Sequence, residues 1–142
     1  MAGPPIFFKA TQAFRLVPDN RFAAGEWKAM TRDYIYTVYE QTADRQLGAR
    51  SAWHWHPGSG GTPDPHIHVH AGDQIFGREV GRLHIPSERV AFESVTMFLV
   101  DDLGVRPERA DWREITSSAL AMFMRFRTWP RSVGPSLDAE PS

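Results

Sequence analysis

Five of the six histidines of this 142-residue chain lie between positions 54 and 70, in two groups separated by a segment rich in Gly and Pro. Within each group the histidines are two residues apart. Side chains alternate between the two faces of a β-strand, so this spacing places the histidines of one strand on one face. Imidazole changes charge near neutral pH and is the commonest protein ligand of transition metals. If the two groups lie on paired strands, their imidazoles gather on one surface, where proton transfer or metal binding is the expected chemistry.

Metal binding is the first interpretation of this cluster. The chain contains no cysteine, so the ligands of a metal would come from histidine and carboxylate side chains. A divalent ion needs three or four ligands about 2.0–2.2 Å away, which His-x-His pairs on neighbouring strands can supply. The expected ligands are His54, His56, His66, His68 and His70. Asp64, Asp73 or His84 would add a further ligand, and the expected cofactor is a divalent metal such as Zn or Mn.

General acid–base cleavage of RNA is the second interpretation. One histidine takes a proton from the attacking hydroxyl, and another protonates the leaving oxygen. An arginine stabilises the developing phosphate charge, and a tyrosine stacks on a splayed base. The candidate catalytic residues are His54, His56, His66, His68, Arg50 and Tyr36, with Tyr34, Arg82 and Arg89 as further companions. The remaining interpretation is a structural or surface role for the histidines, without turnover.

The composition limits the other functions. Lys and Arg number 16 against 17 Asp and Glu, so the formal net charge of -1 creates no global field that attracts nucleic acid or an anionic membrane. A polyanion would therefore bind through a local patch. The sequence has no Walker loop, dinucleotide fingerprint, Ser elbow or HExxH motif. It also shows no signal peptide and no apolar run near the roughly 20 residues of a membrane span, so we expect a cytoplasmic protein without a membrane partner.

Strands are expected to position the histidines. Aromatic and β-branched residues favour strands over residues 26–30, 33–41, 47–56 and 66–70, with short strands over 74–76 and 82–85. The Gly- and Pro-rich segment 57–65 connects the two histidine groups. Residues 6–17 are predicted to form a helix because their apolar residues recur at helix-like intervals, although a strand through Ile6, Phe7 and Phe8 fits almost equally well.

Two helices are predicted after the strands. Apolar residues recur at helical spacing from Phe92, and Gly104 stands where a left-handed residue would end that helix. Asp111 precedes a second apolar stripe over residues 112–126 and resembles the start of a capping box. Strands followed by helices predict an α+β fold, in which two C-terminal helices pack on one face of an antiparallel sheet of four to six strands.

A single domain is expected over residues 6–130, between a flexible N-terminus (1–5) and a flexible C-terminal tail (131–142). Within that domain, Trp53 and Trp55 alternate with the first histidine group. Burying a Trp side chain removes on the order of 200 Å² from water, so the tryptophans are expected to face the helices. The histidines would then occupy the opposite face of the sheet.

The order of the elements provides a family resemblance. A Tyr-rich strand at residues 34–36 is followed by a strand ending in Trp53-His54-Trp55-His56, a Gly loop, a His-x-His strand and a helix that opens at Phe92. This order covers about residues 34–103 and resembles that of the TumE-like toxin family of prokaryotic toxin–antitoxin modules. The resemblance implies a toxin that acts on RNA or nucleotides and a helix-turn-helix antitoxin as its partner.

The second histidine group carries a shorter resemblance. Residues 66–72 satisfy the pattern His-φ-His-φ-His-φ-φ, where φ is an apolar residue, which is similar to that of the histidine-triad nucleotide hydrolases. This resemblance implies that His68, the middle histidine, attacks a phosphorus atom. We therefore expect a small phosphodiester-cleaving enzyme that uses histidine acid–base or metal-assisted chemistry. A non-catalytic divalent-metal-binding or structural module is the first alternative, and a histidine-triad-like nucleotide hydrolase is the second.

Overall fold

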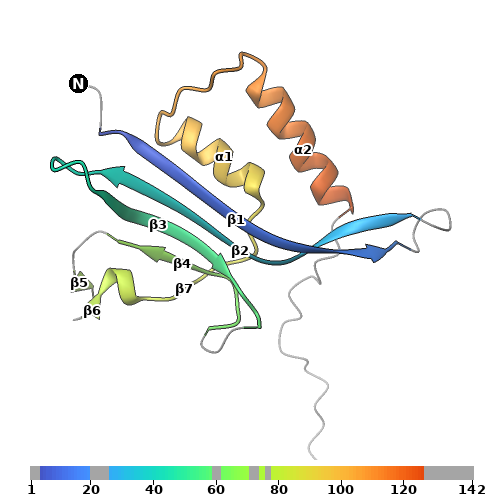
Figure 1. Cartoon of the computed structure of the whole chain (residues 1–142), viewed down its shortest axis with the longest axis horizontal. Helices are drawn as coiled ribbons and strands as arrows, with labels where there is room; N and C mark the ends of the chain where they lie inside the picture. The colour runs from blue at the N-terminus through green and yellow to red at the C-terminus, as the bar shows by residue number, and fades with distance from the viewer. Residues whose placement is uncertain (1–3, 20–25, 59–61, 71–73, 76–77, 127–142) are drawn as a thin grey trace, which may run out of the picture.

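The computed structural model describes residues 4–19, 26–58, 62–70, 74–75 and 78–126, which form an α+β fold (Figure 1). A five-stranded antiparallel sheet has the strand order β1-β2-β3-β4-β7. Its strands are β1 (Ile6–Pro18), β2 (Trp27–Gln41), β3 (Leu47–Trp55), β4 (His66–Val69) and β7 (Ile85–Pro86). The helices α1 (Phe92–Asp101) and α2 (Trp112–Phe126) follow the sheet in the chain and lie on the same side of it. The predicted fold class is confirmed.

The chain between β4 and β7 forms small elements of its own. Strands β5 (Gln74–Ile75) and β6 (Arg78–Glu79) pair with each other in a separate two-stranded sheet, and the 3-10 helix η1 (Val80–Arg82) follows them. The strand predicted over residues 82–85 is therefore largely wrong, because Arg82 ends η1 and β7 begins only at Ile85. Strand β7 includes Pro86 because it lies at the edge of the sheet, where the missing N–H of proline costs no ladder hydrogen bond.

The segment 6–17 forms a strand, so the prediction of a helix there is wrong. Strand β1 pairs with β2 over its whole length, from Ile6 opposite Glu40 to Pro18 opposite Trp27. Pairing with a long neighbouring strand outweighs the helix-like spacing of the apolar residues, because that spacing is only a weak local preference. Phe8 consequently lies on the helix side of β1, where its ring centroid is 5.9 Å from that of Phe92 in α1.

The core lies between the sheet and α1. Tyr34 and Tyr36 of β2, each 2% exposed, stack with their ring centroids 4.7 Å apart, and Val95 of α1 packs against them. Trp53 and Trp55 of β3 pack against the same cluster. The prediction that both tryptophans face the helices is therefore confirmed. Because side chains alternate along a strand, the histidines between and beyond these tryptophans point to the other face of the sheet.

The segment that connects the two helices contains a left-handed residue near its start. Gly104 has φ +69°, as predicted for the end of the first helix, and the N–H of Val105 donates to the carbonyl of Leu99 at 3.0 Å. Arg113 of α2 forms an ion pair with Asp101 of α1. Among the residues that the structure describes, no helix is long and apolar enough to cross a membrane.

Candidate functional site

The pairing of β3 with β4 brings the two histidine groups together. The antiparallel register places His54 directly opposite His66, and His68 opposite Ala52 one step further along the same face. The ring centroids of His54 and His68 are 4.9 Å apart, and those of His66 and His68 are 5.0 Å apart. The expectation that the histidines share one surface is therefore confirmed.

Three of these histidines form a compact group that we call the histidine trio: His54, His66 and His68. One ring nitrogen from each lies within 4.8 Å of the corresponding nitrogens of the other two. In the described part of the chain, this is the one group of three or more His, Cys, Asp or Glu side chains with that geometry. His66 is only 2% exposed, while His54 and His68 are half-buried. The trio therefore lies partly sheltered from water, although it sits on the face away from the helices.

Backbone carbonyls determine which ring nitrogen each of two histidines presents. The Nδ1 of His66 lies 2.8 Å from the carbonyl oxygen of Asp64, and the Nδ1 of His68 lies 3.2 Å from that of Gly81. A carbonyl oxygen can only accept a hydrogen bond, so in both rings Nδ1 carries the hydrogen and donates it. The Nε2 lone pair of each ring is then the one left for a ligand, which is the arrangement common in metal-binding histidines.

Burial and crowding shift the protonation of the trio. Burial, together with the neighbouring His68 and His66, lowers the pKa of His54 to about 4. Burial also lowers the pKa of His68, against the opposing effect of its hydrogen bond to Gly81. His54 is therefore a neutral imidazole at neutral pH, and a neutral ring is the form that binds a metal.

The segment containing η1 and β7 closes over the second histidine group. His84 lies against the trio, with its ring centroid 5.0 Å from that of His66 and 4.8 Å from that of His68. The backbone at Gly81 approaches so closely that a Cβ there would lie 2.7 Å from the Nδ1 of His70. Glycine at this position therefore allows the segment to pack directly on the histidines.

The remaining two histidines of the predicted set border the trio without joining it. The ring of His70 stacks on that of His68 with centroids 6.1 Å apart, at the outer end of the cluster. His56 lies at the other end, with its ring centroid 5.4 Å from that of His66. Of the predicted extra ligands, Asp64 contributes its carbonyl to His66 and is not in the trio, whereas Asp73 lies outside the described residues.

The side chains of two predicted companion residues, Tyr36 and Arg50, have partners other than the histidines, although the carbonyl of Arg50 accepts a hydrogen bond from the N–H of His70 at 2.8 Å. Tyr36 is in the core on the opposite face, where its hydroxyl donates to Oε1 of Gln12 at 3.2 Å and burial raises its pKa. Arg50 is an extra residue between the pairs Val38–Ser51 and Tyr39–Ala49, and its guanidinium forms an ion pair with Glu40 at 3.1 Å.

The other predicted companions are not members of the trio. Tyr34 is a core residue whose hydroxyl accepts a hydrogen bond from the N–H of Val90 at 2.9 Å. The guanidinium of Arg89 stacks over the ring of Trp55 at 3.2 Å from its centroid, and burial lowers the pKa of Arg89 to about 10. Arg82 is exposed at the end of η1.

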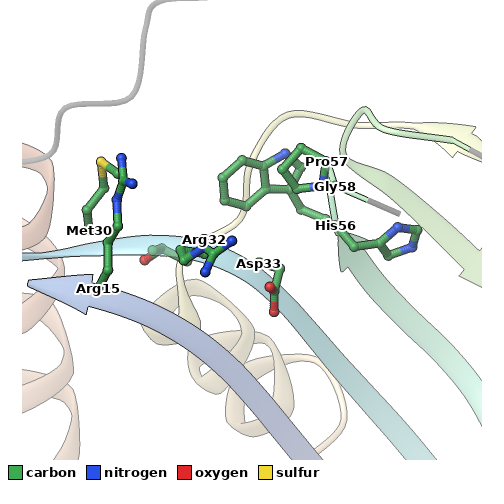
Figure 2. Close-up of a pocket in the computed structure, with 9 residues that line it drawn as sticks. Arg15, Met30, Arg32, Asp33, His56, Pro57 and Gly58 are labelled. Carbon is green, nitrogen blue, oxygen red and sulfur yellow. The ribbon is translucent and has the colours of Figure 1, made fainter. Parts of the chain in front are cut away.

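A cleft of about 700 Å³ adjoins the histidine cluster and contains residues that sequence reasoning did not single out. Figure 2 shows Arg15, Met30 and Arg32 on one side of the cleft and His56 and Gly58 on the other. The cleft is lined by Arg15, Met30, Thr31, Arg32, Asp33, Trp55, His56, Pro57 and Gly58. No local sequence signal marks the two arginines, because their proximity depends on how β1 and β2 pair.

Comparison with known proteins gives no match. No protein-family model, curated protein or solved structure matches this chain. The resemblances to TumE-like toxins and histidine-triad hydrolases therefore stay predictions, and the function has to be inferred from the residues of the site.

Proposed function

We propose that the chain binds a divalent transition metal through His54, His66 and His68. The observation that carries this proposal is that one nitrogen from each of the three rings lies within 4.8 Å of the other two. The carbonyls that hold Nδ1 of His66 and His68 support it, because they leave Nε2 of both rings for the ion.

The donor set favours zinc. A tetrahedral zinc ion lies about 2.0–2.1 Å from histidine nitrogens, which places those nitrogens roughly 3.4 Å apart. A small inward movement of the three rings reaches that spacing. Imidazole suits zinc, whereas manganese prefers carboxylate and water ligands, and the trio contains no carboxylate. Three protein ligands also leave a coordination position open, as in catalytic zinc sites.

The test is a zinc titration of the full chain by calorimetry after treatment with a chelator. We expect one ion per chain. His68→Ala removes a ligand and is expected to weaken zinc binding by about 100-fold or more. His70→Ala is the matched control, because this ring stacks on His68 but lies outside the trio, and its affinity should stay within about threefold of wild type. Equal zinc affinity in the His68→Ala and wild-type proteins would refute the proposal.

Metal-assisted hydrolysis of a phosphodiester is the second candidate function, and the position of His56 favours it. His56 lies outside the trio, yet its ring borders His66 and the residue lines the open cleft. A metal at the trio would lower the pKa of a bound water toward about 7, and His56 would exchange a proton with a substrate in the cleft. We therefore propose again, as the second candidate function, the phosphodiester cleavage that the sequence predicts.

The catalytic proposal is tested with an RNA oligonucleotide and zinc-loaded protein. His56→Ala is expected to keep zinc affinity within about threefold and to reduce cleavage by about 100-fold or more, as is typical for loss of a general acid or base. Undiminished cleavage after complete zinc removal would favour acid–base chemistry without a metal. Tight zinc binding with no cleavage in wild type would favour the non-catalytic metal-binding module.

A further inference from the structure

We propose that the cleft beside the histidine trio is a subsite for the phosphate group of a nucleotide-sized substrate, with Arg15 and Arg32 as its anion-binding residues. The catalytic meaning of this subsite rests on the proposed metal-assisted function, whereas phosphate binding stands on the cleft alone. Its volume of about 700 Å³ lies within the range of about 300–1,000 Å³ typical of small-molecule sites.

A β-bulge brings the second arginine to the cleft. Arg15 of β1 pairs with Met30 of β2, and the pairing then shifts, so that Phe14 pairs with Thr31 while Ala13 pairs with Asp33. Arg32 is therefore the extra residue of β2. In a regular strand Arg32 and Asp33 would point to opposite faces, but both line the cleft. Re-aiming a side chain is a common use of a bulge beside a functional site.

The cleft has an excess of positive charge. Arg15 and Arg32 carry two positive charges, against one negative charge on Asp33. Within the described ranges of the chain, no hydrogen bond or ion pair engages any of these three side chains. A guanidinium presents a planar fork of N–H donors that matches two oxygens of a phosphate. The two unpaired arginines therefore favour a phosphate-bearing ligand.

The other walls of the cleft favour a nucleotide over free phosphate. Trp55 lines the cleft, and because the guanidinium of Arg89 covers one face of its ring, a base would contact the part of the ring that Arg89 leaves uncovered. The hydroxyl of Thr31 accepts a hydrogen bond from Nε2 of Gln12 at 2.8 Å, which leaves its own O–H to donate to the ligand. A nucleotide with its phosphate at the arginines and its base near Trp55 would fill more of the cleft than free phosphate does.

His56 connects this subsite to the histidine trio. The residue lines the cleft, while its ring contacts the rings of His54 and His66 with centroids 5.8 and 5.4 Å apart, respectively. Figure 2 shows its imidazole pointing away from the two arginines. A phosphate ester held by the arginines is thus placed on one side of His56 and the proposed metal on the other.

The test measures binding of adenosine 5′-monophosphate to the full chain by calorimetry, with inorganic phosphate and adenosine as comparison probes. Wild type is expected to bind the nucleotide more tightly than either fragment. Arg15→Ala and Arg32→Ala should each weaken nucleotide binding about tenfold or more, since a hydrogen-bonded charge is lost. Arg106→Ala is the matched control, because it removes one charge from an exposed site between the helices and should change the affinity less than about twofold.

Any of three results would overturn the proposed subsite. The first is unchanged nucleotide affinity in both Arg15→Ala and Arg32→Ala. The second is adenosine binding as tight as that of the nucleotide, and the third is no nucleotide binding by wild type at millimolar concentration. Both arginines are exposed, so folded variants are expected, and Arg32→Glu provides a second test that should weaken binding more than Arg32→Ala.

A zinc titration of Arg32→Ala separates this inference from the proposed function. Zinc affinity should be unchanged, because Arg32 lies outside the trio. If wild type binds no zinc while the arginine variants still lose nucleotide affinity, the metal proposal fails and the subsite stands. If zinc binds and the variants keep their nucleotide affinity, the subsite fails and the metal proposal stands.

Discussion

Acid is expected to destabilise the metal-free protein through His54. Burial, together with the neighbouring His68 and His66, lowers the pKa of His54 from 6.5 to about 4. Between these two pH values the folded chain keeps the imidazole neutral, whereas the unfolded chain protonates it. Protons therefore favour the unfolded state. The contribution of His54 to stability is fully present above about pH 6.5 and is lost as the pH falls toward 4.

The size of this loss follows from the pKa difference and the exposure of the ring. A pKa lowered from 6.5 to about 4 corresponds to about 3.4 kcal/mol if solvent screens none of the effect. His54 is half-buried, so water screens part of it. We expect His54 to account for a decrease of roughly 1–2 kcal/mol in the free energy of unfolding between pH 7.5 and 4.5. That is a large share of the roughly 5–15 kcal/mol that stabilises a typical domain.

The assay is urea unfolding of chelator-treated protein across this pH range, comparing wild type with His54→Gln. Other groups titrate in both proteins, so the difference between the two curves reports mainly on His54. The variant should lose roughly 1–2 kcal/mol less stability than wild type as the pH falls. Losses that agree within about 0.3 kcal/mol in the two proteins would refute the reasoning that the cluster is desolvated.

Other perturbations test the core, the cover over the histidines and the toxin interpretation. Tyr36→Phe is expected to cost about 0.5–1.5 kcal/mol in urea unfolding, because its hydrogen bond to Gln12 is lost, and to leave cleavage unchanged. Lost cleavage in that folded variant would restore the catalytic role expected from the sequence. Val95→Ala should cost about 1–3 kcal/mol because Val95 is 1% exposed; a cost under about 0.5 kcal/mol would contradict the assigned core. Gly81→Ala should weaken zinc binding in calorimetry, because a Cβ only 2.7 Å from Nδ1 of His70 would shift the backbone at position 81, whose carbonyl accepts the hydrogen bond from Nδ1 of His68; unchanged affinity would argue against this cover. If the protein is a toxin, induced expression should arrest growth in wild type but not in His68→Ala, and equal growth of both strains would contradict that role.

The gathering of the histidines on one face could be predicted from the sequence because it depends on local alternation. Trp53 and Trp55 alternate with His54 and His56, and burying two large apolar rings determines which set faces the helices. The second group has the same spacing on β4, so adjacency of the two strands suffices to bring the rings together. The antiparallel sheet and the two C-terminal helices were predictable for a similar reason, because each has a clear local periodicity.

The residues around the trio could not be predicted, because their positions depend on register between distant strands. Arg15 falls in a segment whose own spacing favours a helix, and only its pairing with β2 makes it part of the cleft. Arg32 reaches the cleft through a bulge that the sequence of β2 does not reveal. Tyr36 was expected near the histidines, but the pairing of Tyr36 with Trp53 places it on the tryptophan side. Alternation along one strand sorts its side chains onto two faces, but only the register between strands shows which residues of neighbouring strands share a face.

The location of the trio on β3 and β4 has a consequence for how a metal would bind and dissociate. Main-chain hydrogen bonds between these strands hold the three positions in register. In a zinc finger, by contrast, ion uptake and chain folding are one event, and chelation unravels the domain. If the trio binds an ion as proposed, the pairing of β3 with β4 should persist when a chelator removes that ion, and the same site should bind an ion again without refolding.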